Sequence, residues 1–95
     1  MKAKQATSAA ADVVVRNPHG IHLRPAAQFA RMALATGCNI KVEANGVEAN
    51  GASIFALALL GALQGTTLRI SADGADAEEA VRSLVALVTN GFSGT

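Results

Sequence analysis

A histidine, an arginine and a proline lie close together at His22, Arg24 and Pro25, where a loop is expected to pass into a helix. Pro25 suits the first helical turn, where its missing amide hydrogen is not needed, and His22 is then the N-cap, a position at which histidine is not preferred. The backbone amides of Leu23 and Arg24 at such a helix start attract anions, and Arg24 can hold a phosphate through two parallel hydrogen bonds. Because imidazole is also a nucleophile, these residues predict a site at which His22 carries a phosphoryl group.

A metal site is a weaker alternative for the same region. His19 and His22 are three residues apart, but only Cys38 could complete the set, and these three side chains make a poor zinc site. We therefore expect no metal and no bound cofactor. A single cysteine forms no intramolecular disulfide, so Cys38 is read as a small packed hydrophobic residue and favours a reducing cytoplasm.

Composition narrows the classes of function. The chain has 95 residues, of which 51% are hydrophobic, 3% aromatic and 16% charged, with a net charge of +1. This length suits one domain, the even charge balance argues against nucleic-acid binding, and no apolar run approaches the roughly 20 residues of a membrane span. The charges are unevenly placed, however, with +5 in residues 1–41 and −4 in residues 42–95. An acidic partner or an anion is therefore expected at the early segment.

The pattern of apolar and turn residues predicts one α+β domain over residues 12–95, preceded by a mobile tail at residues 1–11. Alternating residues predict strands, helical spacing predicts helices, and Asn45-Gly46 predicts a hairpin turn. The expected strands are 12–16, 39–44, 47–49 and 66–72, and the expected helices are 22–36, 54–60 and 77–88. This β-α-β-β-α-β-α order indicates an open-faced sandwich, a four-stranded antiparallel sheet with three helices on one face.

The helix expected at residues 54–60 is apolar nearly all round. Its geometry places Leu57 and Leu60 on one side and Ile54, Phe55 and Leu59 away from them. The second group either packs against neighbouring helices or forms a docking patch beside His22, and we favour the docking patch because small domains rarely expose such a patch without use. Ser53, directly before this helix, is a good N-cap.

Three blocks of sequence resemble the HPr family, the histidine-containing phosphocarriers of the bacterial phosphotransferase system. They are residues 20–27 (GIHLRPAA), 50–54 (NGASI) and 63–66 (LQGT), and with the order of elements the resemblance covers about residues 12–90. It implies a phosphoryl carrier rather than an enzyme, with the same four-stranded, three-helix fold.

The resemblance also implies roles for individual residues. His22 would accept a phosphoryl group on its δ nitrogen from an enzyme I-like donor and pass it to an enzyme II-like acceptor, while Arg24 steadies the phosphate. Ser53 corresponds to the position that a dedicated HPr kinase modifies in some bacteria. The partner-docking surface would include Leu23, Ile54 and Phe55.

Some alternatives stay open at this stage. Many members of the family carry a basic or polar residue after the first two apolar residues of the second helix, whereas Ala56, Ala58 and Leu59 are nonpolar here. This departure leaves open which partners the chain serves. Separate alternatives are a carrier in a nitrogen-related branch and a regulatory binding module that leaves His22 unused. The opening Met1 and the short length favour a free protein, expected to be a monomer, over a module of a larger phosphotransferase.

Overall fold

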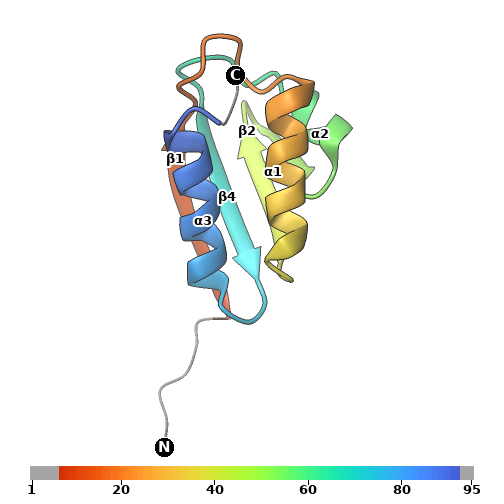
Figure 1. Cartoon of the computed structure of the whole chain (residues 1–95), viewed down its shortest axis with the longest axis vertical. Helices are drawn as coiled ribbons and strands as arrows, with labels where there is room; N and C mark the ends of the chain where they lie inside the picture. Colours follow the sequence, from red (N-terminus) through yellow and green to blue (C-terminus); the bar gives the residue numbers. More distant parts are fainter. Residues whose placement is uncertain (1–6, 93–95) are drawn as a thin grey trace, which may run out of the picture.

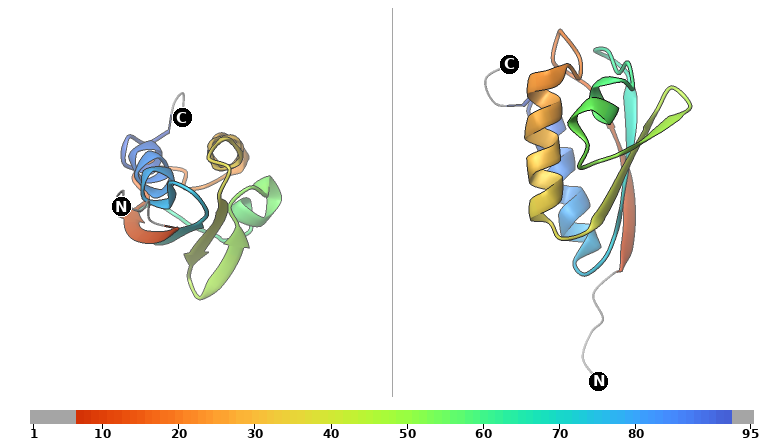
Figure 2. Two further views of the ribbon diagram at one scale, coloured as in Figure 1. Left: turned by 90° about the horizontal axis from the view of Figure 1, so that it is seen from below. Right: turned by 90° about the vertical axis from the view of Figure 1, so that its right-hand side faces the viewer.

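The computed structural model describes residues 7–92 and contains one four-stranded sheet in the order β1-β4-β2-β3, with every neighbouring pair antiparallel. The strands are β1 (Ser8–Val14), β2 (Asn39–Ala44), β3 (Val47–Asn50) and β4 (Thr67–Asp73). The helices α1 (Leu23–Ala35), α2 (Ile54–Ala58) and α3 (Ala77–Thr89) lie on one side of this sheet, as Figure 1 and Figure 2 show. The predicted open-faced sandwich is confirmed.

Strict alternation along the central strands produces the two faces of the sheet. Ile40 and Val42 of β2 and Ile70 of β4 are buried beneath the helices, while the residues between them point to the open face. On the open face Arg69 of β4 pairs with Asp12, its cross-strand partner on β1, at 3.1 Å. An exposed pair of this kind contributes little stability, so the buried face holds the sheet and helices together.

The two long helices bury stripes of mostly small residues, which let them lie close to the sheet. Both helix predictions agree with the structure to within one residue at each end. The buried residues are Pro25, Ala26, Phe29, Ala30 and Ala33 in α1, and Ala77, Ala80, Val81, Leu84 and Val88 in α3. At the β2–β3 hairpin, Asn45 and Gly46 both take positive φ, as the predicted two-residue turn requires.

The expected N-terminal tail needs a correction. Strand β1 begins at Ser8, so residues 8–11 pair with β4 and are not a tail, while residues 1–6 lie outside the described part of the chain. The carbonyl of Thr7 also accepts the Gly74 amide at 2.8 Å. Residues 9–11 are alanines, which have low strand propensity, so no local pattern indicates the pairing that β4 imposes.

Candidate functional site

His22 is the N-cap of α1, as predicted. Its backbone is extended (φ −91°, ψ −167°), its side chain is exposed, and it makes no capping hydrogen bond. The first bond of the helix runs from the Ala26 amide to the His22 carbonyl at 3.0 Å, so the amides of Leu23 and Arg24 lie before it and point out of the helix start. The imidazole therefore lies where a helix N-terminus favours negative charge.

The loop before α1 is held by hydrogen bonds that converge on Gly20. Its amide donates to the Asn17 carbonyl at 3.1 Å, and its carbonyl accepts both the Asn17 side-chain amide and the His22 backbone amide. Asn17 is buried, with 4% of its surface exposed. A buried side chain thus fixes the backbone directly before the exposed imidazole.

A second segment, the loop before β4, contacts the backbone of the loop that carries His22. The Ile21 amide donates to the Ala62 carbonyl at 2.9 Å, and Gly20 has φ +69° with no room for a Cβ against that same carbonyl. Only glycine combines this backbone conformation with such a close approach. The turn that positions His22 therefore depends on contact between segments about 40 residues apart in sequence.

The metal alternative gains no support. Among the described residues no group of three His, Cys, Asp or Glu side chains could hold a metal ion. His19 and His22 are neighbours, but Cys38 follows the far end of the 13-residue α1, about 20 Å along the helix. There the Cys38 thiol donates to the Ala75 carbonyl at 3.2 Å.

The predicted docking residues are exposed and belong to two helices that contact each other, α1 and α2. Leu23 is 54% exposed and Phe55 is 72% exposed, whereas Leu57, on the opposite side of α2, is 2% exposed. The predicted division into buried and exposed side chains is confirmed, but α2 ends at Ala58, two residues before the expected end of the helix. We define the apolar patch as the exposed side chains Leu23, Ile54, Phe55, Leu59 and Leu63.

Leu63 was missed by the sequence reasoning as a member of this patch. Its Cα lies next to Gly20, so this exposed side chain begins beside the loop that carries His22. In the sequence, Leu63 is simply a large apolar residue in a loop next to the small residue Ala62. The structure buries Ala62 and leaves Leu63 exposed. Such a residue is identified as surface only once the loop is placed.

Ser53 caps α2, as predicted. Its side-chain oxygen accepts a hydrogen bond from the Ala56 amide at 3.3 Å, and the residue is half-buried. The next two residues, Ile54 and Phe55, belong to the apolar patch. A modification of Ser53 would therefore act at the border of this patch.

Charged side chains are unevenly distributed between the start of α1 and the start of α3. The segments that build the site lie within residues 13–42 and 49–72, and neither contains an Asp or Glu. In contrast, Asp76, Glu78 and Glu79 lie at the start of α3, at the opposite end of the molecule from the start of α1 (Figure 1). We call the end that holds the start of α1 the positive end, because Arg16 and Arg24 belong to the segments around His22. Glu43 and Glu48 flank the β2–β3 turn, whose Asn45 side chain contacts the Leu60 carbonyl at 3.3 Å.

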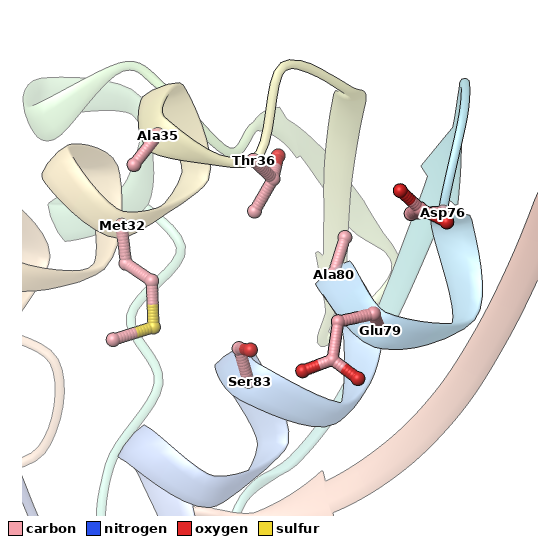
Figure 3. A pocket seen from close by; sticks show the side chains of 7 residues that line it. All are labelled: Met32, Ala35, Thr36, Asp76, Glu79, Ala80 and Ser83. Atoms are coloured by element: carbon pink, nitrogen blue, oxygen red, sulfur yellow. The ribbon is translucent and has the colours of Figure 1, made fainter.

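A shallow pocket at the opposite end is separate from this site. It lies between the last turns of α1 and the first turns of α3, and Figure 3 shows Met32 and Thr36 on one side and Glu79 and Ser83 on the other. The structure does not bring it near His22. Among the described residues, no helix is both long and apolar enough to cross a membrane.

Comparison with known sequences identifies the class of protein to which this fold and site belong. Residues 9–90 match the family of the HPr component of the phosphotransferase system, described by its phosphorylation site. The chain belongs to the HPr family. It is a phosphocarrier of the phosphotransferase system, as the resemblance predicted.

Individual relatives agree with this assignment. The phosphocarrier protein HPr of Haemophilus influenzae is 47% identical over 77 residues, which cover 81% of this chain and 91% of that protein. A multiphosphoryl transfer protein of Escherichia coli O157:H7 is 38% identical over 77 residues, covering 78% of this chain but 20% of that longer protein. The crystal structure of an HPr from Thermoanaerobacter tengcongensis superimposes with a TM-score of 0.84 at 34% identity, covering 92% of this chain and 98% of that one.

Proposed function

We propose that His22 is the residue that carries the phosphoryl group, received from an enzyme I-like donor and passed to an enzyme II-like acceptor. One observation supports this most directly. His22 lies at the start of α1 with its imidazole exposed and not engaged in capping the helix. A cap of a preferred type would stabilise the helix better, so a histidine here is best explained by the chemistry of its ring.

The proposed transfer exchanges one nitrogen–phosphorus bond for another. A ring nitrogen of neutral His22 attacks the phosphorus of a phosphohistidine on the donor, and the donor nitrogen keeps the electron pair as its bond to phosphorus breaks. A nucleophilic nitrogen of the acceptor then attacks the phosphorus on His22, and the His22 nitrogen keeps the electron pair as its bond to phosphorus breaks. The amides of Leu23 and Arg24 and the Arg24 guanidinium stabilise the phosphoryl charge throughout.

The remaining parts of the proposal concern partners and location. The apolar patch docks both partners beside His22, and the positive end of the molecule meets their acidic surfaces. A nucleophile and an anion site lie together at the start of α1, and we infer that the domain acts as a carrier and not as a catalyst. We infer that it works as a monomer in the cytoplasm, in the sugar branch of the system, and that a kinase of the HPr type can modify Ser53.

The proposal is tested by labelling with an enzyme I and radiolabelled phosphoenolpyruvate. Wild type should gain an acid-labile, alkali-stable label, while His22→Ala should gain none and remain folded, with at most about 1 kcal/mol of stability lost. Arg31→Ala is the matched control, because it changes an exposed side chain of α1 about two turns beyond the start of the helix and should keep the label. Label in a folded His22→Ala protein would contradict the assignment, and absence of label in wild type would favour a binding module that works through the apolar patch alone.

A further inference from the structure

We propose that His19 is a second cationic group of the phosphoryl site, which in its protonated form holds the phosphoryl group on His22. The inference rests on the proposed role of His22. The two imidazole rings are close, with centroids 6.3 Å apart and an interplanar angle of 79°, so that one ring presents its edge to the other. Both side chains are exposed at the positive end of the molecule.

The backbone on both sides of His19 is fixed, so this proximity is built into the fold. Pro18 restricts the chain before it, and the Gly20 amide closes the turn onto the Asn17 carbonyl at 3.1 Å. The Gly20 carbonyl then accepts the His22 amide, also at 3.1 Å. His19 thus lies within the first of two consecutive hydrogen-bonded turns, and His22 ends the second.

Charge explains what this proximity does. A phosphoryl group adds about 1.5–2 negative charges at pH 7, and an opposite charge within roughly 4–6 Å favours the charged form of an ionisable group. Phosphorylation of His22 therefore favours uptake of a proton by His19. By reciprocity, a protonated His19 favours phosphorylation of His22 to the same extent.

His19 differs from the other cations at this end of the molecule because its charge changes near neutral pH. The other charged or titratable side chains in the loop and first turn around His22 are Arg16, Arg24 and His22 itself, and an arginine stays charged across this pH range. The acidic side chains Glu43 and Glu48 flank the β2–β3 turn, which contacts Leu60 and Gly61. The neighbouring residues 51–66 and the end of α3, residues 83–92, contribute no titratable side chain. Since imidazole changes charge between about pH 5 and 8, His19 should make phosphorylation more favourable as the pH falls.

The test measures the equilibrium constant for phosphoryl exchange between phosphorylated enzyme I and the full chain at pH 6 and at pH 8.5. Wild type is compared with His19→Asn, which is neutral at both values, and with His19→Lys, which is cationic at both. An equilibrium constant does not depend on how well the partners dock, and the donor's own pH dependence is common to all three proteins. A structural role of His19 would therefore not change the ratio between pH values.

We expect wild type to exceed His19→Asn by roughly three- to tenfold at pH 6 and to match it at pH 8.5, whereas His19→Lys exceeds His19→Asn at both. The same ratio of wild type to His19→Asn at both pH values would overturn the role of His19 while leaving His22 as carrier. Failure of any label to form on His22 would instead overturn the proposed function, and the role of His19 with it.

Discussion

The side-chain amide of Asn17 donates a hydrogen bond to the carbonyl of Gly20, and the same carbonyl accepts the backbone amide of His22. One buried side chain is thereby linked through a single oxygen to the residue proposed to carry the phosphoryl group. Asn17 cannot reach the phosphoryl group by chemistry of its own, since it is 96% buried. Its effect on transfer must therefore act through the position of His22.

Asn17→Ala should lower both stability and transfer. Loss of one buried hydrogen bond costs about 1 kcal/mol of stability, and the Gly20 carbonyl no longer has a side-chain donor that fixes its position. We expect the rate of label transfer from enzyme I to fall more than the final extent of labelling, because His22 keeps its chemistry but loses its fixed position. Urea unfolding and stopped labelling reactions measure the two effects.

Asn17→Asp removes the hydrogen-bond donor of this side chain while keeping nearly the same side-chain volume. It has nearly the same shape, but it places a buried carboxylate against the Gly20 carbonyl in place of a donor. The loss of stability should exceed that of Asn17→Ala, since an unpaired buried charge costs more than a missing hydrogen bond. Equal stability and equal transfer rates in wild type and both variants would show that the Asn17 bond does not position the site.

Arg24→Ala should slow phosphoryl transfer roughly tenfold, because a charge-assisted hydrogen bond contributes about 1.5 kcal/mol and each 1.4 kcal/mol changes a rate tenfold. Stability should change little, since Arg24 is exposed. Arg31→Ala is the matched control, because Arg31 is also exposed on α1 but lies two turns further from His22. Equal rates for both variants would make Arg24 an ordinary surface charge.

The sequence was sufficient for the elements whose signals are local. The stripe in α3 and the Asn45-Gly46 turn are set by residues close together in the chain, and both were predicted within a residue. The predicted start of the first strand, at residue 12, is too late, because Ala9 and Ala11 become strand residues only through pairing with β4. That pairing joins residues about 60 positions apart, which a local pattern does not encode.

The same distinction separates the predicted from the unpredicted parts of the site. The N-cap position of His22 and the exposed side of α2 follow from helical geometry, and both were correctly expected. The support that Ala62 gives to Gly20, and the exposure of Leu63, depend on how two distant loops meet. No spacing within one segment could indicate them.

Phe55→Ala should weaken binding to the phosphoryl donor by roughly five- to thirtyfold, as expected when a central aromatic side chain of an interface is removed. Stability should be nearly unchanged, because Phe55 is 72% exposed. Leu34→Ala is the matched control, since Leu34 is 68% exposed but lies at the far end of α1 from His22. Calorimetric titration with enzyme I measures the affinities of both variants. Equal affinities of Phe55→Ala and Leu34→Ala would exclude the apolar patch as the docking surface.

Ser53→Asp, or phosphorylation of Ser53, should weaken donor binding without unfolding the domain. Asp is as good an N-cap as Ser, so the capping bond to Ala56 has a replacement and α2 should persist. The new charge borders Ile54 and Phe55, which must lose water against a partner, and it repels the acidic surface expected there, so affinity should fall roughly tenfold. Ser53→Ala is the opposite control. It should lose about 1 kcal/mol of stability through the missing cap and keep its affinity for the donor. Titration of enzyme I against wild type, Ser53→Asp and Ser53→Ala measures the affinities, and circular dichroism monitors folding. Equal affinity of Ser53→Asp and wild type would leave Ser53 with its capping role alone.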